Sequence, residues 1–414
     1  MSRSVRVLVC GGGVAGNAVA LQLLRAGIDT TVVERAPAPR PGGQGVSLRG
    51  AGRAVAERMG LMASIRRSQL DERGMVVVDE HGRTLARMSA ERFGGDRFLA
   101  DIELSRGDLN RVLLDEIGAL PIGSGVLDYR YGDWVEELAQ DAEAVKVRFA
   151  SGAVDSFDLL IGADGLHSDL RKQVFGPHEQ FTEYLGAYVG FFTMPTPPGT
   201  MLDTAWGGVY PVPGNAVGMR PDRDPANSTA IINIRMPVDE GLRGDVEKQQ
   251  HLIRERLAGH GWVVPAILDA MADAPDFYFD EMVRVRMPTW SRGRVVLLGD
   301  AAYCGSPMTG MGTTLALVGA YLLAGEIAAT PTNLTRAFDR YEELMRPLAS
   351  GVQKGTAVTV RLLLPKTRRA LAVRLTLLGI VVSGPLRPVR ALLTRLLGTR
   401  GEYQLPDYTD LTAP

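Results

Sequence analysis

Residues 5–35, VRVLVCGGGVAGNAVALQLLRAGIDTTVVER, decide the fold class of this chain. An apolar run of strand length leads into glycines at positions 11, 13 and 16, then into apolar residues at helical spacing, and finally into a second apolar run that ends in Glu34. In this pattern the glycines permit a tight turn, a close approach to a pyrophosphate and helix–strand packing. The stretch predicts a dinucleotide cradle in which Glu34 accepts hydrogen bonds from ribose hydroxyls, with NAD and FAD both open.

A second stretch with the same organisation is FDLLIGADGLHSDLRKQVFG, residues 157–176. Its apolar run ends at Asp164 and Gly165, a turn signal, and the following helical pattern carries Ser168 and Arg171. A hydroxyl and a guanidinium near a helix N-terminus favour an anion, so we expect Ser168 and Arg171 to face one.

The third stretch is VLLGDAAYCGSPMTGMGTTLALVGAYLLA, residues 295–323. It predicts a central strand over 295–298, a carboxylate at Asp300, a glycine turn and a helix over 313–329. Asp300 can accept a hydrogen bond from a ribityl or ribose hydroxyl. The amides of the glycine turn and of the helix N-terminus can meet a phosphate or a ring carbonyl.

Together the three stretches read G-x-G-x-x-G…Glu-Arg, GADGxxSxxR and GDAAxxxxPxxGxG. This set resembles the class A FAD-dependent aromatic hydroxylases and monooxygenases, a family that includes para-hydroxybenzoate hydroxylase and the tetracycline-inactivating monooxygenases. The resemblance implies tightly bound, non-covalent FAD that NADPH or NADH reduces transiently. Dioxygen then adds to the flavin, and the hydroperoxyflavin gives one oxygen atom to an aromatic or polyketide-like molecule, in antibiotic biosynthesis, other secondary metabolism or xenobiotic modification.

The resemblance also assigns single residues to the flavin. Arg106 begins a helix and reaches the flavin, Gly45 and Val46 lie beside the isoalloxazine, and Val126 ends the strand that leads to the adenine edge. Asp164 is shared between FAD and the nicotinamide. The predicted cofactor-binding residues are Gly11, Gly13, Ala15, Gly16, Glu34, Arg35, Gly45, Val46, Arg106, Val126, Asp164, Asp300, Gly310, Gly312 and Thr313. Tyr303 and Thr314 depart from the family, which usually has His and Asn there.

The implied fold is α/β, a Rossmann-like FAD-binding domain of the GR2 type with an inserted antiparallel β-sheet substrate domain and C-terminal helices. Short β-branched and aromatic runs separated by Pro, Gly and Asn support the inserted sheet. The expected boundaries are 1–70, 100–180 and 283–345 for the FAD-binding domain, 71–99 and 181–282 for the substrate domain, and 346–400 for a basic helical segment.

Candidate substrate contacts are less defined. Phe191, Met194, Tyr210 and Met219 could line an apolar pocket on one sheet face, or could be sheet core, because alternation alone does not say which face is wet. Arg220 could orient an anionic or phenolic substrate or be a solvated strand-end residue, and the resemblance adds Pro307. We assign no catalytic side-chain base, since the flavin is the reactive group, and we expect His167 to be a surface loop residue.

Composition narrows the classes of function. Lys and Arg number 46 against 47 for Asp and Glu, which gives nucleic-acid binding no electrostatic support. The two cysteines cannot form a disulfide framework, and the N-terminal residues lack the pattern of a signal peptide, so we expect a cytoplasmic protein. The five histidines lack metal-ligand spacing, which predicts no metal site. A monomer and a homodimer are both compatible with the sequence.

The C-terminal region differs from the rest because no acidic residue occurs between Glu343 and Glu402. Its longest uncharged run, residues 375–386, is shorter than the roughly 20 residues that span a bilayer. We expect helices that pack on their own domain with arginines extending outward. The alternative is a basic amphipathic helix on a membrane surface.

Other functions remain open on the same fold. They include a flavin-dependent epoxidase, oxidase or reductase. The four tryptophans are isolated, which argues against a halogenase with a Trp-x-Trp-x-Ile-Pro segment, and no second G-x-G-x-x-G supports a two-Rossmann Baeyer–Villiger enzyme. A non-enzymatic nucleotide-binding or membrane-surface protein is a third class.

Overall fold

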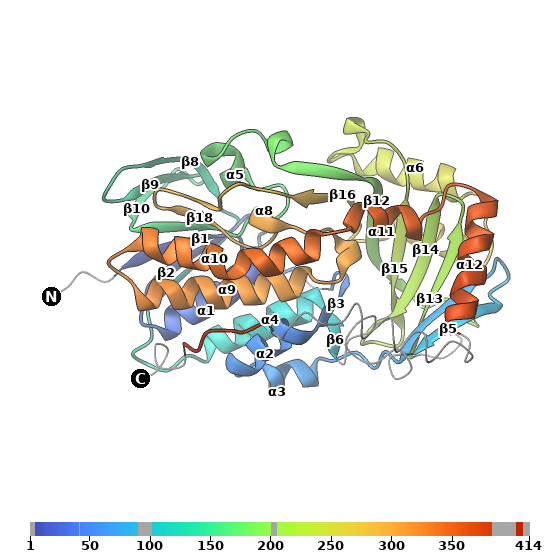
Figure 1. Ribbon diagram of the computed structural model, residues 1–414, viewed down its shortest axis with the longest axis horizontal. Coiled ribbons are helices and arrows are strands. Elements are labelled where there is room, and N and C mark those ends of the chain that lie inside the picture. The colour runs from blue at the N-terminus through green and yellow to red at the C-terminus, as the bar shows by residue number, and fades with distance from the viewer. Residues whose placement is uncertain (1–4, 41, 90–101, 200–204, 383–402, 409–414) are drawn as a thin grey trace.

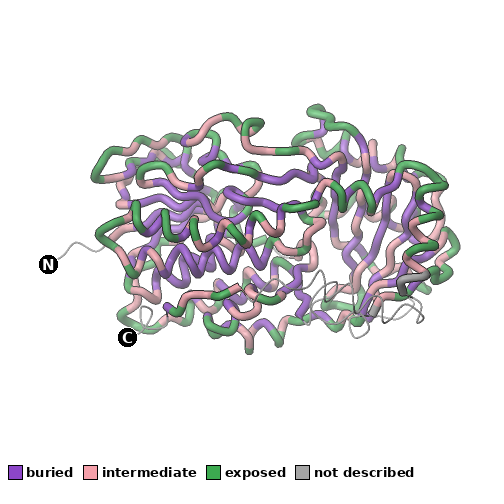
Figure 2. Tube along the Cα trace, in the orientation of Figure 1, coloured by how far each residue is buried: buried purple, intermediate pink, exposed green. Residues whose placement is uncertain are grey.

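The computed structural model describes residues 5–40, 42–89, 102–199, 205–382 and 403–408. Two large sheets organise the molecule and lie at opposite ends of its long axis (Figure 1). A six-stranded sheet surrounded by helices forms one end, and a seven-stranded sheet forms the other. Figure 2 shows buried chain concentrated along both sheets and along the long helix beside the first.

The six-stranded sheet has the strand order β17-β18-β11-β1-β2-β7. All neighbouring pairs are parallel except β17–β18. Val7, Leu8 and Val9 of β1 are fully buried, as in a parallel sheet that is covered on both faces. The strands are β1 (Arg6–Cys10), β2 (Asp29–Glu34), β7 (Leu127–Tyr131), β11 (Leu159–Gly162), β17 (Ser291–Arg292) and β18 (Val295–Leu297).

The helices around this sheet are held by a long central helix, α9 (Gly312–Ala329), which packs on α1, α2 and α10. Among the described residues, α9 is the one helix that is long and apolar enough to cross a membrane, but 78% of it is buried inside the protein. Packing therefore accounts for its apolar composition. The other helices are α1 (Val14–Arg25), α2 (Gly50–Arg58), α3 (Met62–Arg67), α4 (Arg106–Gly118) and α10 (Leu334–Gln353).

Smaller elements complete this unit. An antiparallel three-stranded sheet adds Phe149 and Phe157 to the core that holds β1. A two-stranded sheet pairs β3 with β6, and short helices follow β11 and β18. These elements are β3 (Gly45–Leu48), β6 (Ile102–Ser105), β8 (Val135–Gln140), β9 (Val145–Phe149), β10 (Val154–Phe157), α5 (Asp169–Val174), η1 (His178–Gln180) and α8 (Asp300–Tyr303).

The seven-stranded sheet has the order β16-β12-β15-β14-β13-β4-β5. Its neighbouring strands are antiparallel, except that β4 joins β13 in parallel. β4 and β5 form an antiparallel hairpin at one end of this sheet. The strands are β4 (Gly74–Val78), β5 (Thr84–Ser89), β12 (Thr182–Pro195), β13 (Trp206–Val212), β14 (Asn215–Pro221), β15 (Asn227–Ile234) and β16 (Tyr278–Val285).

The two faces of this sheet pack against different elements. One face, which we call the α6 face, is covered by α6 (Val246–Leu257), α7 (Val264–Ala270) and the short turns η2 (Glu240–Leu242) and η3 (Met271–Asp273). The other, the α11 face, meets α11 (Thr356–Leu363) and the turn η4 (Pro307–Thr309). Strand alternation sorts side chains between them: Phe192 packs on the α6 face, and Phe191 packs on the α11 face.

The C-terminal region packs against both units. Helix α10 runs across the boundary expected at residue 345, and α12 (Arg368–Val382) then lies against β5 and β13. Residues 403–408 lie back on α9, where the ring of Tyr408 occupies the space that a side chain at Gly325 would need. Tyr408 is buried and belongs to the core of the six-stranded unit.

Candidate functional site

The turns after β1, β11 and β18 meet at the carboxyl edge of the six-stranded sheet. The Ala163 amide donates to the Cys10 carbonyl at 2.8 Å. A Cβ atom placed on Gly11 would overlap with Ala163, and one placed on Gly299 would lie 3.0 Å from the Cβ of Ala15. The three sequence motifs therefore form one continuous site, because parallel pairing aligns the ends of their strands.

Two different physical constraints favour glycine in the first motif. Gly11 has φ +111°, and a Cβ on Gly16 would overlap with the Gly11 carbonyl, so packing excludes side chains at both positions. Gly13 is exposed, and a Cβ there would meet nothing within 4 Å. It is the N-cap of α1 and has no side-chain cap. The open space in front of uncapped helix amides fits a pyrophosphate.

Glu34 is fixed at the same edge by backbone amides. Its two carboxylate oxygens accept from Gly12 N at 2.7 Å and from Ala36 N at 2.8 Å. Arg35 is exposed, and its guanidinium lies over the Trp134 ring at 5.1 Å from the centroid. Backbone amides thus hold the carboxylate, with no ion pair to a cation among the described residues, and it keeps acceptor capacity for a ribose hydroxyl.

Val126 does not lie at this edge, so the sequence expectation for it is corrected. It precedes β7 and accepts from Thr30 N at 2.9 Å, at the beginning of β2. Because β7 runs parallel to β2, the β7 residue beside Glu34 is Tyr131, at the other end of the strand. Tyr129 also belongs to this end, since its hydroxyl abuts the glycine turn of the first motif. The expected strand ended at Val126, whereas β7 begins only after it, at Leu127, so Val126 lies at the far edge.

Two aspartates supply free acceptor capacity in the site. Asp300 begins α8 and is accessible to solvent, although protein surrounds its carboxyl group closely. Desolvation raises its pKa, and the Cys304 thiol and the charge of Arg106 act against that rise. Asp164 accepts from Leu170 N at 3.1 Å through one oxygen, while its buried second oxygen has no partner among the described residues. Desolvation raises the pKa of Asp164 as well.

Ser168 and Arg171 do not face an anion, contrary to expectation. Ser168 caps α5 by accepting from Arg171 N at 2.9 Å. The Arg171 side chain is fully buried and donates to the carbonyls of Ala301 (2.8 Å) and Leu166 (2.6 Å) and to Nδ1 of His178 (2.6 Å). The guanidinium therefore ties the second motif to the third and positions both aspartate turns.

The loop of residues 42–46 lies against the start of α4. Arg106 N donates to the Gln44 carbonyl at 3.0 Å, and a Cβ on Gly43 would lie 3.5 Å from Nε of Arg106. Val46 is buried in β3, which pairs with the strand before Arg106. The structure thus brings together Gly45, Val46 and Arg106, which the resemblance placed beside the flavin ring.

The glycine turn of the third motif precedes α9. Gly310 has φ +61°, and Gly312, exposed at the start of α9, has nothing within 4 Å of a Cβ placed on it. Thr313 is buried in the first turn of the helix, and Pro307 is exposed on η4. Tyr303 is buried, and its hydroxyl accepts from the Tyr341 hydroxyl at 3.1 Å, so this departure from the family points into the core.

The apolar residues proposed for one substrate face lie on two faces. Phe191 packs on the α11 face, and its ring lies 6.4 Å from that of Tyr278. Met194, Tyr210 and Met219 pack on the α6 face, under α6 and α7. The expectation of a shared face is therefore wrong. Phe191 and Met194 are three positions apart in one strand, so alternation already separates them.

Arg220 is mostly buried, not solvated at a strand end as one expectation had it. Part of its guanidinium is already bonded to protein carboxylates and therefore cannot contact a ligand. It donates to the buried carboxylates of Glu72 (Nε to Oε2, 2.9 Å) and Glu103 (Nη2 to Oε2, 3.0 Å). Desolvation lowers the pKa of Arg220, but the two carboxylates outweigh it and raise the pKa overall. A Cβ on Gly45 would lie 2.8 Å from Nη1, so this ion cluster directly supports the loop of residues 42–46.

Sequence reasoning missed Glu72 and Glu103, which lie 148 and 117 residues from Arg220. It also missed that His167 contacts Asp280, with Nε2 and Oδ2 2.6 Å apart, while Tyr278 donates to the same oxygen at 3.1 Å. The His167 side chain is partly exposed, as expected for a loop residue. No local sequence pattern predicts any of these partners, because each contact joins segments that are far apart in the chain.

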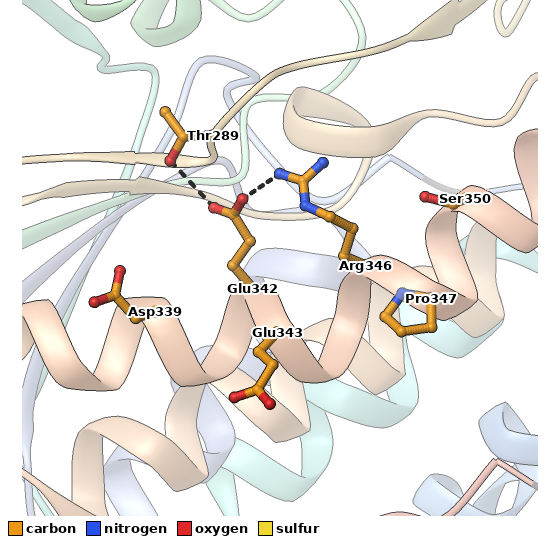
Figure 3. Close-up of a pocket in the computed structure, with 7 residues that line it drawn as sticks. All are labelled: Thr289, Asp339, Glu342, Glu343, Arg346, Pro347 and Ser350. Atoms are coloured by element: carbon orange, nitrogen blue, oxygen red, sulfur yellow. Dashed lines mark hydrogen bonds and ion pairs between the residues drawn. The ribbon is translucent and has the colours of Figure 1, made fainter.

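A surface depression of about 540 Å³ lies away from these motifs, on α10. Its lining is Thr289, Asp339, Glu342, Glu343, Arg346, Pro347 and Ser350, and Glu342 bonds both Thr289 and Arg346 (Figure 3). The carboxylates there are engaged with neighbours or solvated. Within the described part of the chain, no cluster of His, Cys, Asp and Glu could hold a metal ion.

Comparison with known proteins agrees with this geometry. A family model described as "FAD binding domain" matches residues 4–356. The uncharacterized protein Rv1260 of Mycobacterium tuberculosis is 40% identical over 343 residues, which cover 81% of this chain and 88% of that protein. A flavin-dependent monooxygenase of Legionella longbeachae is 35% identical over 360 residues, covering 86% and 88%.

The crystal structure of the tetracycline destructase Tet(51) superposes with a TM-score of 0.79 at 31% identity, covering 98% of this chain and all of the other. The predicted resemblance is confirmed, and so is FAD as the cofactor. The open spaces at Gly13 and Gly312 and the unpartnered oxygen of Asp164 show that the residues present fit that group.

Proposed function

We propose that this chain, which belongs to the FAD-binding-domain family and is a flavin-dependent monooxygenase, uses NADPH or NADH and dioxygen to insert one oxygen atom into an aromatic or polyketide-like molecule. The observation that carries the proposal is the convergence of the three turns at one sheet edge beside the α11 face. In the balanced reaction, substrate, O₂, NAD(P)H and a proton give oxygenated substrate, NAD(P)⁺ and water.

Different groups of the protein would bind different parts of FAD. The amides at the start of α1 would bind the pyrophosphate, and Glu34 would accept from the ribose hydroxyls. Asp300 and the free oxygen of Asp164 would accept hydrogen bonds from hydroxyl groups along the ribityl chain. Bound FAD supplies the redox chemistry, which leaves positioning and exclusion of water to the protein. Arg106 and the loop of residues 42–46 would border the ring.

The α11 face supports an apolar, ring-containing substrate. Phe191 and Tyr278 present stacked rings there, and Met308 of η4 packs against the same cluster. The ion cluster of Arg220 lies at the border between this face and the loop of residues 42–46. Such a combination of apolar wall and few polar groups is typical of small-molecule sites. The names of relatives fit this class, since one destroys tetracycline.

The proposal also places the enzyme in the cytoplasm. Cys10 and Cys304 are both buried and free, which suits a reducing compartment. NADPH and NADH are supplied there. A fusion to a fluorescent protein in the native host would report the compartment directly.

The proposed reaction is tested by mixing the purified flavoprotein anaerobically with NADPH or NADH and following the visible absorbance of the flavin. Phenolic and polycyclic compounds, tetracycline among them, are present or absent, and free FAD serves as the control. Bleaching that a compound accelerates, followed on admission of air by a product heavier by one oxygen atom, is the expected result. Hydrogen peroxide without any product would indicate an oxidase, and no bleaching would remove the proposed electron source.

A further inference from the structure

Helix α12 is an apolar helix that buries very little. Over residues 368–379, where burial is described, only Leu371 is buried. Val373 and Leu377 remain 60% and 57% exposed, although α12 lies against β5 and β13. A helix that packs on a globular protein normally turns its apolar stripe inward. In α12, part of that stripe faces away from the protein.

Helix α11 shows the same division. Val360 and Leu364 pack into the α11 face of the sheet, whereas Val358 and Leu362 are 56% and 66% exposed. The exposed residues are spaced i and i+4 in each helix, so each helix presents one short outward apolar stripe. Figure 2 shows exposed chain along both helices, which are consecutive in the sequence.

Exposed cations lie close to these stripes in the sequence. They are Lys354, Arg361, Lys366, Arg368 and Arg369, and no salt bridge involves them within the described ranges. The sequence contains no acidic residue from 344 to 401, although the whole chain carries a net charge of only −1. We call these five cations, together with Val358, Leu362, Val373 and Leu377, the basic apolar face.

We propose that the basic apolar face docks on an anionic lipid membrane surface. Apolar side chains flanked by Lys and Arg suit the boundary between acyl chains and anionic headgroups. A second copy of the chain fits less well, because a two-fold dimer through this face would set the cations of one copy against those of the other. The proposal goes beyond the oxygenase function, and docking requires no turnover.

The experiment uses the full-length, FAD-loaded protein in a vesicle flotation assay. Vesicles of phosphatidylcholine with phosphatidylglycerol are compared with vesicles of phosphatidylcholine alone, at low and high salt. We expect binding to the anionic vesicles only, and weaker binding at high salt because salt screens headgroup charge. Comparable binding to both vesicle types, or to neither, would overturn the proposal.

Two variants localise the contact. The first replaces the apolar residues (Val358→Ser, Leu362→Ser, Val373→Ser, Leu377→Ser), and the second replaces cations (Arg361→Gln, Arg368→Gln, Arg369→Gln). Each should lower vesicle binding by roughly tenfold or more, given the usual contribution of a lysine or arginine near an anionic surface. Bound flavin absorbance and the unfolding midpoint confirm that each variant is folded.

Matched controls carry the same changes at exposed positions elsewhere: Ile122→Ser, Val154→Ser, Val238→Ser and Val246→Ser for the apolar set, and Arg66→Gln, Arg223→Gln and Arg256→Gln for the cations. They should bind vesicles as the parent does. Equal loss in the controls would refute a localised face. So would light scattering that shows self-association through the face while vesicle binding is absent.

Discussion

The carboxyl edge of the six-stranded sheet and the α11 face of the seven-stranded sheet are linked through η4 but are specified in different ways. At the edge, backbone amides, glycines without room for a side chain, and three carboxylates make the site. On the face, side chains from β12, β14, β16 and η4 come together from distant parts of the chain. On the proposed assignment, cofactor binding depends on local backbone geometry, and substrate binding depends on long-range packing.

We expect the largest effects at the carboxyl edge from substitutions of its glycines. Gly16→Ala places a Cβ atom into the Gly11 carbonyl, so we expect loss of bound FAD and destabilisation of about 3 kcal/mol or more. Gly13→Ala meets no protein atom and should fold with parental stability, to within about 1 kcal/mol, while binding FAD more weakly. Flavin content and urea unfolding measure both. Equal stability of the two variants would contradict the distinction between packing glycines and ligand-facing glycines.

The border between the two regions depends on the ion cluster. Arg220→Ala leaves the buried carboxylates of Glu72 and Glu103 without that cation, and we expect a loss of about 3–5 kcal/mol in the free energy of unfolding. Combining Arg220→Met with Glu72→Gln should recover part of it, because fewer buried charges stay unpaired. Urea unfolding at neutral pH gives both values. A loss below about 1 kcal/mol would mean that water compensates the carboxylates.

At the same edge, we expect a substitution of Asp300 to affect FAD binding but not the stability of the fold. Asp300→Asn removes a charged acceptor that no described backbone amide satisfies, and it should weaken FAD binding by roughly 10- to 100-fold with little effect on stability. Asp115→Asn, exposed on α4, is the matched control and should bind FAD normally. Fluorescence titration of the apoprotein with FAD measures the dissociation constants. Parental affinity in the Asp300 variant would remove this residue from the site.

The role of the α11 face is tested by comparing substitutions on the two faces of the seven-stranded sheet. Phe191→Ala lies on the α11 face and should raise the KM for an identified substrate by roughly tenfold, the effect of losing one stacked ring. Tyr210→Phe, on the α6 face, keeps its packing and should leave KM unchanged. Steady-state kinetics distinguish the two outcomes. Should Tyr210→Phe alone change KM, the assignment of the faces would have to be reversed.

The smallest effect concerns His178, behind the edge. Burial, and then the charge of Arg171, lower its pKa from 6.5 to about 4, so the folded protein keeps it neutral while the unfolded chain binds a proton. This neutral histidine therefore contributes fully above pH 6.5, and stability falls as pH decreases toward 4. His178→Gln should lose less stability than the parent between pH 6.5 and 4.5, measured by urea unfolding midpoints. Parallel pH profiles would contradict a neutral His178.

The sequence alone determined the cofactor edge because its information is local. A glycine with a positive φ, a helix N-terminus and an acidic residue at a strand end follow from short stretches, and parallel strands carry their ends to one edge. The resemblance then gave FAD, and the comparisons confirm it.

The tertiary structure alone decided the rest. The direction of β7 put Val126 at the far edge, and Tyr210 and Met219 pack under α6 and α7, on the face opposite Phe191. Arg220 gained buried partners more than a hundred residues away. Alternation and charge patterns state which residues share a side within one element. Which side meets protein, ligand or lipid depends on the segments that pack against it, and these lie far apart in the chain.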